Sequence, residues 1–314
     1  MSAEIRSGLE PQDIRVGPDL SLRAIFWDTG SDRKDTGVLA SQSDTVVLLH
    51  GMGDSADNWR PVLRHWRAPR SHRVFAFDLP GHGQSDPLPE GAYREELIAI
   101  RIAAALHSLG ATRPILVGHS RGARIALRLL REGIEPAQII LIDMAAVDQH
   151  PNHAAIAAHI RKMAEPAFSR QLLVTLCAEK LPLVDIESLT EVIETRAVKT
   201  VSGWRLPVDL NCLALLDEPT APEALASLSA LTCPVTFIRG ALSAILNRQE
   251  LTRLKDVTKT PVAIYEIPRA GHALLIEQPK ELAEVLVQRT MVIPEPRLGQ
   301  TDSEIAVERR VGEA

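Results

Sequence analysis

The stretch ILVGHSRGARIALRLL, residues 115–130, decides the fold class. It opens with an apolar run typical of a buried strand and continues with apolar residues at helical spacing. The pentapeptide Gly118-His119-Ser120-Arg121-Gly122 lies at the junction and fits G-x-S-x-G, a tight turn from strand to helix that exposes a serine. Glycines suit this turn because side chains two residues either side of the serine would collide. Taken alone, the pentapeptide also fits an ordinary serine cap at a helix start.

The same alternation of apolar run and helical segment extends to both sides of this stretch. It predicts an α/β fold with a parallel sheet, whose strands are covered on both faces. The predicted strands are Thr45–His50, Arg73–Asp78, Ile115–Gly118, Ala137–Asp143, Val235–Gly240 and Val262–Ile267. The predicted helices are Asn58–Trp66, Tyr93–Leu109, Arg121–Arg131, Arg248–Val257 and Pro279–Met291.

Three segments depart from this alternation. Two short extended runs flank Gly17-Pro18-Asp19 and predict an antiparallel hairpin at the sheet edge. Between Asp143 and Leu231 helical periodicity continues without a strand signal for far longer than a crossover needs, which indicates an inserted cap. The final segment is charged and lacks periodicity. The predicted domains are a core of residues 1–143 and 226–294, a helical cap of residues 144–225, and a mobile tail of residues 295–314.

The composition favours a globular protein that binds small molecules. Of the 314 residues 45% are hydrophobic, and 35 Lys and Arg against 40 Asp and Glu give a net charge of −5. No run of like charge indicates a nucleic-acid or membrane partner, and neither an export signal nor 18 consecutive apolar residues occur. Cys177, Cys212 and Cys233 are widely separated without metal-ligand spacing, which favours a cytoplasmic location over a disulfide framework.

Two further motifs follow predicted strands. The first, His50-Gly51-Met52-Gly53, can turn its amides inward, so Met52 N–H is the expected partner of Arg121 N–H in an oxyanion hole; taken alone, it is a common glycine turn. The second, Gly271-His272, follows the last strand. Because ligands bind at the carboxyl ends of parallel strands, His272 can reach Ser120 and serve as the general base that a serine nucleophile needs.

Together these motifs resemble the α/β-hydrolase superfamily over nearly the whole chain. The resemblance rests on HGMG at 50–53, DLPGHGQSD at 78–86, GHSRG at 118–122, and GH with a following E-x-P at 271–279. It implies a mostly parallel, eight-stranded sheet flanked by helices, with an inserted cap. We interpret the glycine-rich segment 81–85 as a structural turn. A serine at this position argues against epoxide and haloalkane hydrolysis of the superfamily's kind. For those reactions the resemblance would require an aspartate in place of Ser120.

The triad acid departs from the usual pattern. Ser243 stands after the strand that follows the cap, where most superfamily members have an aspartate. Asp143 instead ends the strand after the nucleophile helix, so its carboxylate should emerge at the same sheet edge as Ser120. This resembles a minority subgroup that includes the hydrolases of N-formylmaleamate and acetamidomethylene-succinate. We predict that Asp143 orients His272, because a triad is defined by roles and not by sequence position. The alternatives are Asp148 and Glu250.

A row of arginines and several cap residues are candidates for substrate binding. The row Arg121, Arg124, Arg128 and Arg131 at helical spacing is either a solvated stripe or, at Arg121 and Arg124, a fork for a carboxylated substrate. Trp204 is a further candidate, with core packing as its alternative. The remaining cap candidates are His150, His153, His159, Arg161, Lys162, Arg196 and Arg205. The cap histidines lack the spacing of a zinc motif.

These observations predict a serine hydrolase that cleaves a small-molecule amide, formamide or ester through an acyl-enzyme, without metal or cofactor. The subgroup resemblance favours a C–N bond in an acidic metabolite. Lactone and thioester hydrolysis pass through the same intermediate and are alternatives. Cofactor-free C–C bond cleavage and a non-catalytic ligand receptor are the alternatives from other classes.

Overall fold

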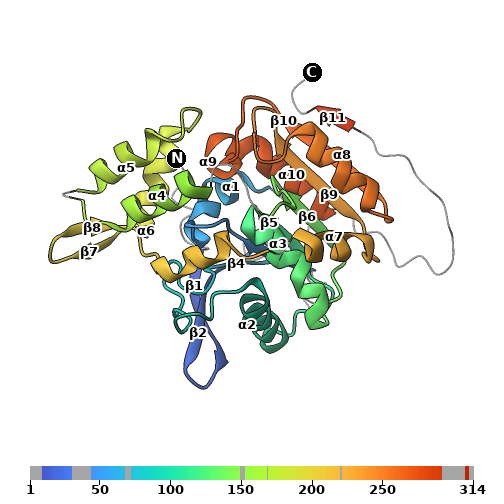
Figure 1. Ribbon diagram of the computed structural model, residues 1–314, viewed down its shortest axis with the longest axis horizontal. Helices are drawn as coiled ribbons and strands as arrows, with labels where there is room; N and C mark the ends of the chain where they lie inside the picture. The colour runs from blue at the N-terminus through green and yellow to red at the C-terminus, as the bar shows by residue number, and fades with distance from the viewer. Residues whose placement is uncertain are drawn as a thin grey trace, which may run out of the picture.

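The computed structural model describes residues 9–29, 44–67, 72–148, 153–167, 169–219, 221–291 and 308–310. Within these ranges the central sheet has nine strands in the order β1-β2-β4-β3-β5-β6-β9-β10-β11 (Figure 1). The strands are β1 (Glu10–Gly17), β2 (Leu20–Asp28), β3 (Asp44–Leu49), β4 (His72–Phe77), β5 (Ile115–His119), β6 (Gln138–Ile142), β9 (Val235–Gly240), β10 (Val262–Ile267) and β11 (Glu308–Arg310).

The sheet confirms the predicted α/β fold. The hairpin β1–β2 pairs antiparallel at one edge, β2 pairs antiparallel with β4, and every pairing from β4 to β11 is parallel. The three-residue β11 extends the sheet beyond the eight predicted strands. It lies within the segment predicted as a tail, most of which falls outside the described residues.

Helices cover both faces of the sheet, as the alternation along β3 requires. Val47 and Leu49 contribute to a core packed by α2, α3, α7 and α8, whereas Val46 and Leu48 contribute to a second core packed by α1, α9 and α10. The helices are α1 (Arg60–His65), α2 (Glu95–Ser108), α3 (Arg121–Arg128), α7 (Ala221–Ser229), α8 (Arg248–Val257), α9 (Leu274–Glu277) and α10 (Pro279–Met291), with short 3-10 helices η2 (Ala56–Trp59) and η3 (Leu129–Glu132).

The inserted segment contains α4 (His153–Ala164), α5 (Arg170–Ala178), α6 (Ile186–Arg196), β7 (Val198–Thr200), β8 (Gly203–Arg205) and η4 (Leu210–Leu216). It lies beside the core, with α5, α6, β7 and β8 on its outer side (Figure 1), whereas η4 and Ile160 of α4 pack in the main core cluster. Its apolar cluster includes Ile276 of α9, which joins it to the core. The expectation of an insertion without strands is wrong, because β7 and β8 pair; three residues are too few for a strand period to show. Helix α7 spans the predicted boundary at 225/226 and packs on α3 and α8.

Within the described residues, every helix is too short or too polar to cross a lipid bilayer.

Candidate active site

Ser120 occupies a strained turn between β5 and α3. Its φ of 52° and ψ of −117° lie in a region that residues other than glycine rarely adopt. A Cβ on Gly118 would lie 2.4 Å from Ala123 N, and one on Gly122 would lie 2.3 Å from Leu49 O. Both glycines are therefore required where the helix start passes close to β3 and β5, as G-x-S-x-G predicts.

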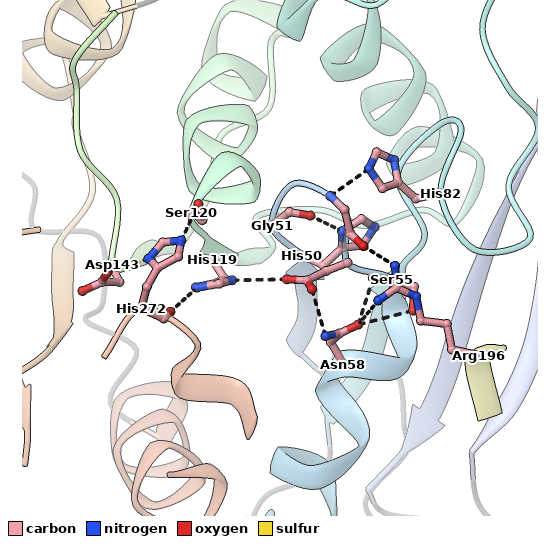
Figure 2. A network of polar contacts seen from close by, with 12 residues as sticks. His50, Gly51, Ser55, Asn58, His82, His119, Ser120, Asp143, Arg196 and His272 are labelled. Atoms are coloured by element: carbon pink, nitrogen blue, oxygen red, sulfur yellow. Dashed lines mark hydrogen bonds and ion pairs between the residues drawn. The ribbon is translucent and has the colours of Figure 1, made fainter. Parts of the chain in front are cut away.

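The structure brings together the serine, the histidine and one of the three candidate acids. His272 Nε2 lies 3.0 Å from Ser120 Oγ, and His272 Nδ1 lies 2.7 Å from Asp143 Oδ2 (Figure 2). The carboxylate favours a proton on Nδ1, which leaves the Nε2 lone pair to accept from the serine hydroxyl. The His272 side chain is 35% exposed and that of Asp143 is fully buried, so the base meets solvent while its partner does not.

Asp143 is held by donors besides His272. It directly follows β6 with a φ of 46°, and its Oδ1 accepts from Gly240 N–H at 3.2 Å. The hydroxyl of Ser243 donates to Oδ2 at 2.5 Å. Ser243, which follows β9, thus donates a hydrogen bond to the candidate acid. Three donors therefore satisfy the oxygens of this buried carboxylate.

The alternative acids are engaged elsewhere. Asp148 Oδ1 accepts from Ala221 N–H at 2.6 Å. Glu250 Oε1 accepts from Ala146 N–H at 2.9 Å, and its other oxygen pairs with Arg253 at 3.0 Å. Neither carboxylate contacts His272 in the described structure.

The backbone beside Ser120 presents two amides to the site. His50 Nδ1 donates to Gly51 O at 2.7 Å, and His50 Nε2 accepts from Leu79 N–H at 2.9 Å. Because a trans peptide directs N–H opposite to C=O, this contact turns Met52 N–H away from His50. Among the described residues, no acceptor engages the amides of Met52 or Arg121. Both remain available to an oxyanion.

Two buried histidines support this loop, a role that the sequence analysis missed. His82 Nε2 accepts from Gly53 N–H at 3.2 Å, while its Nδ1 donates to Pro80 O at 3.1 Å. Burial lowers the pKa of His82 to about 4 and the pKa of His50 well below its ordinary value. Both imidazoles are therefore neutral near pH 7, and each keeps the one donor and one acceptor that its contacts need. The motifs HGMG and GHGQS predict glycine turns, and neither motif by itself indicates a role for its histidine.

The turn at 81–85 is structural, as expected. Gly81 and Gly83 have φ values of 73° and 58°. A Cβ on Gly83 would lie 2.1 Å from an oxygen of Asp78, whose carboxylate accepts from Ala56 N–H and Gln84 N–H. The Asp78 carboxylate thus links the end of β4 to this turn and to the start of η2.

His119 is a further residue that the sequence analysis missed, since it fills a variable position of G-x-S-x-G. Its Nε2 donates to the backbone oxygen of His272 at 2.8 Å, and its Nδ1 lies 3.8 Å from Asp54 Oδ2 (Figure 2). Burial lowers the pKa of His119 to about 4. The neutral ring thus fixes the main chain that carries the candidate base.

The arginines after Ser120 are not a solvated stripe at their first two positions. Arg121 and Arg124 are each 7% exposed, and both pair with the buried Glu95, at 2.5 Å and 3.1 Å. Arg124 also donates to Val147 O at 3.1 Å. A substrate carboxylate would have to share these guanidinium groups with Glu95.

The cap candidates take different places. Trp204 packs against the cap cluster beneath the guanidinium of Arg170, 4.0 Å from its ring centre. Arg196 is buried against the loop that follows β3, where it donates to Gly53 O. The remaining candidates are half-buried His153, His159 and Arg205, exposed Arg161 and Lys162, and His150, which lies outside the described residues. No group of side chains in the described ranges could hold a metal ion.

The model of the Alpha/beta hydrolase family matches residues 46–285. Esterase Rv0045c of Mycobacterium tuberculosis is 26% identical over 255 residues, which are 77% of this chain and 80% of that protein. A protein named as a carbamate hydrolase, RutD of Variovorax paradoxus, is 26% identical over 235 residues, 74% of this chain and 86% of its own. The crystal structure of E-2-(acetamidomethylene)succinate hydrolase aligns with a TM-score of 0.74 at 18% identity, over 90% of this chain and all of that one.

Proposed function

The chain belongs to the alpha/beta hydrolase family, and we propose that it is a serine hydrolase that cleaves carboxylic esters or amides of small molecules through an acyl-enzyme. The observation that carries the proposal is the alignment of Ser120 Oγ, the His272 ring and the Asp143 carboxylate, with contacts of 3.0 Å and 2.7 Å. A non-catalytic receptor of the same fold has no need of this alignment, or of two amides beside it that no acceptor of the described residues engages.

The reaction runs in two steps. Ser120 Oγ attacks the substrate carbonyl while His272 Nε2 takes the hydroxyl proton, and Asp143 stabilises the resulting imidazolium. The amides of Met52 and Arg121 hold the oxyanion. His272 returns the proton to the leaving alcohol or amine, so that an acyl-enzyme remains. Water then attacks the acyl carbonyl, His272 takes its proton and passes it to Ser120, and the carboxylic acid leaves.

The relatives guide the choice of bond. Similarity to Esterase Rv0045c supports an ester as the first substrate class, and similarity to RutD supports a C–N bond as the second. A lactone or thioester would use the same groups. For a carboxylated substrate, Arg124 is the residue we propose as its partner, because its Nη2 has no hydrogen-bond partner within the described residues.

The test combines labelling with turnover. A fluorophosphonate probe should label the wild-type protein and fail to label Ser120→Ala, with the adduct located on Ser120 by mass spectrometry. Turnover of a panel of small esters, lactones, thioesters, formamides and dicarboxylic amides then ranks the bond types. Absence of both labelling and turnover in folded wild-type protein would refute the proposal and favour a ligand receptor.

A further inference from the structure

We propose that Arg196 is a positioning residue through which the cap holds the oxyanion loop, residues Gly51–Asp54, in the geometry that catalysis needs. The inference rests on the proposed hydrolase function and adds a role to the cap. Arg196 is the last residue of the cap helix α6 and lies 143 positions along the chain from Gly53, which it contacts.

Arg196 donates to two acceptors, one in the loop and one in the short helix η2 that follows it. Its Nη2 donates to the carbonyl of Gly53, and its Nη1 donates to Asn58 Oδ1 at 3.3 Å. Asn58 in turn accepts from Ser55 N–H at 3.0 Å and donates to Asp54 Oδ1 at 3.0 Å. Figure 2 shows Arg196 and His119 approaching this network from opposite sides. The planar guanidinium is suited to two acceptors fixed at one spacing.

The loop is held at three backbone groups, each by a different side chain. His50 holds Gly51 C=O and His82 holds Gly53 N–H, and both belong to the core. Arg196 holds Gly53 C=O from the cap. Gly53 directly follows Met52, the proposed oxyanion donor, so a cap that withdraws from the core removes one of these three contacts next to the donor. The oxyanion hole is then complete only while the cap is seated.

The charge of Arg196 supports the same conclusion. The residue is 5% exposed, and no carboxylate of the described residues lies within ion-pair distance of it. Its Nε also lacks a hydrogen-bond partner within that part of the chain. No direct ion pair neutralises this buried charge, although Arg196 is among the charges that lower the pKa of the buried Asp78, which burial raises to about 6. The negative charge that forms beside Met52 during attack adds an anion on which this buried cation can act in an interior of low dielectric constant.

These features predict a specific kinetic effect. Since the oxyanion exists only in the transition state and the intermediate, loss of Arg196 should lower kcat and leave KM nearly unchanged. Removing a direct oxyanion donor lowers kcat by about 10²- to 10³-fold. Arg196 acts through the loop, so we expect Arg196→Ala to lower kcat by about 10- to 100-fold.

The experiment measures kcat and KM of Arg196→Ala on the best ester, with and without low-millimolar guanidinium chloride. Guanidinium should enter the space left by the side chain and restore part of kcat. The matched control is Arg64→Ala: Arg64 lies on α1 and also binds α6, at Ser188 (3.3 Å) and Glu191 (3.0 Å), but does not contact the oxyanion loop. The control should keep kcat and show no response to guanidinium.

The outcomes separate this inference from the proposed function. If wild type hydrolyses the ester while Arg196→Ala retains kcat, or loses kcat without rescue, the role of Arg196 is refuted and the hydrolase function stands. If wild type itself shows neither labelling nor turnover, the function fails first. Should Arg196→Ala not fold, Arg196→Lys replaces it: a lower kcat at constant KM supports the role, and a raised KM at constant kcat overturns it.

Discussion

Replacing Asp143 by Asn tests the displaced acid most directly. The carboxylate accepts from His272 and Ser243 at Oδ2 and from Gly240 N–H at Oδ1. An amide cannot accept at both positions. With its oxygen toward His272, its NH2 group would face Gly240 N–H as a second donor. The reverse orientation removes that conflict, but it places N–H against His272 Nδ1.

The reverse orientation selects the imidazole tautomer with a proton on Nε2, which then faces Ser120 and cannot accept its proton. The equivalent change in a serine protease triad lowers kcat by about 10⁴-fold. We therefore expect Asp143→Asn to lower kcat/KM by about 10³- to 10⁴-fold, which corresponds to about 4 to 5.5 kcal/mol of transition-state stabilisation.

The assay is steady-state hydrolysis of the best ester, with circular dichroism to show that the variant is folded and nitrogen NMR of the His272 ring to identify its tautomer. Asp148→Asn is the control, since that carboxylate caps Ala221 N–H and does not reach His272. Retention of more than about a tenth of wild-type kcat/KM by Asp143→Asn, or an equal loss in Asp148→Asn, would refute the assignment.

Three further predictions concern the support of the site. Ser243→Ala removes one hydrogen bond to the candidate triad carboxylate and should lower kcat/KM by about 10- to 100-fold, given that bonds to charged groups contribute about 1.5 to 3 kcal/mol; unchanged kinetics would contradict this. Gly122→Ala should abolish fluorophosphonate labelling and lower the melting temperature, because its Cβ would lie 2.3 Å from a carbonyl oxygen of β3. Acid should destabilise the fold through buried His82 and His119: their pKa of about 4, against 6.5 unfolded, means that the unfolded chain binds protons first. The contribution of these two histidines to the free energy of unfolding is complete above pH 6.5. It is lost as pH falls toward 4, by up to about 3 kcal/mol for each histidine. Burial raises the pKa of Asp78 to about 6, so Asp78 acts in the opposite direction. Urea unfolding followed by tryptophan fluorescence from pH 7.5 to 5 should show this decrease, with a smaller slope in His82→Gln; a flat or rising profile would contradict it.

The sequence by itself determined the sheet and the serine turn. Alternating apolar runs and helical segments fix which strands are parallel and covered on both faces, and the two glycines around Ser120 follow from backbone sterics over five residues. These are local properties, which a pattern along the chain records directly. The positions of Ser120 and His272 at one sheet edge follow in turn, because parallel strands share the edge at which they end.

Only the tertiary structure decided which side chains meet at that edge. Asp143 and His272 are 129 residues apart, and the contact that distinguishes Asp143 from Asp148 and Glu250 depends on how the strand ends and the loop that carries His272 pack. Arg196 reaches its loop across 143 residues, and the arginines after Ser120 are buried by Glu95 of another helix. Spacing predicts which face of an element a side chain occupies; what covers that face is determined by packing between distant segments, for which no local pattern exists.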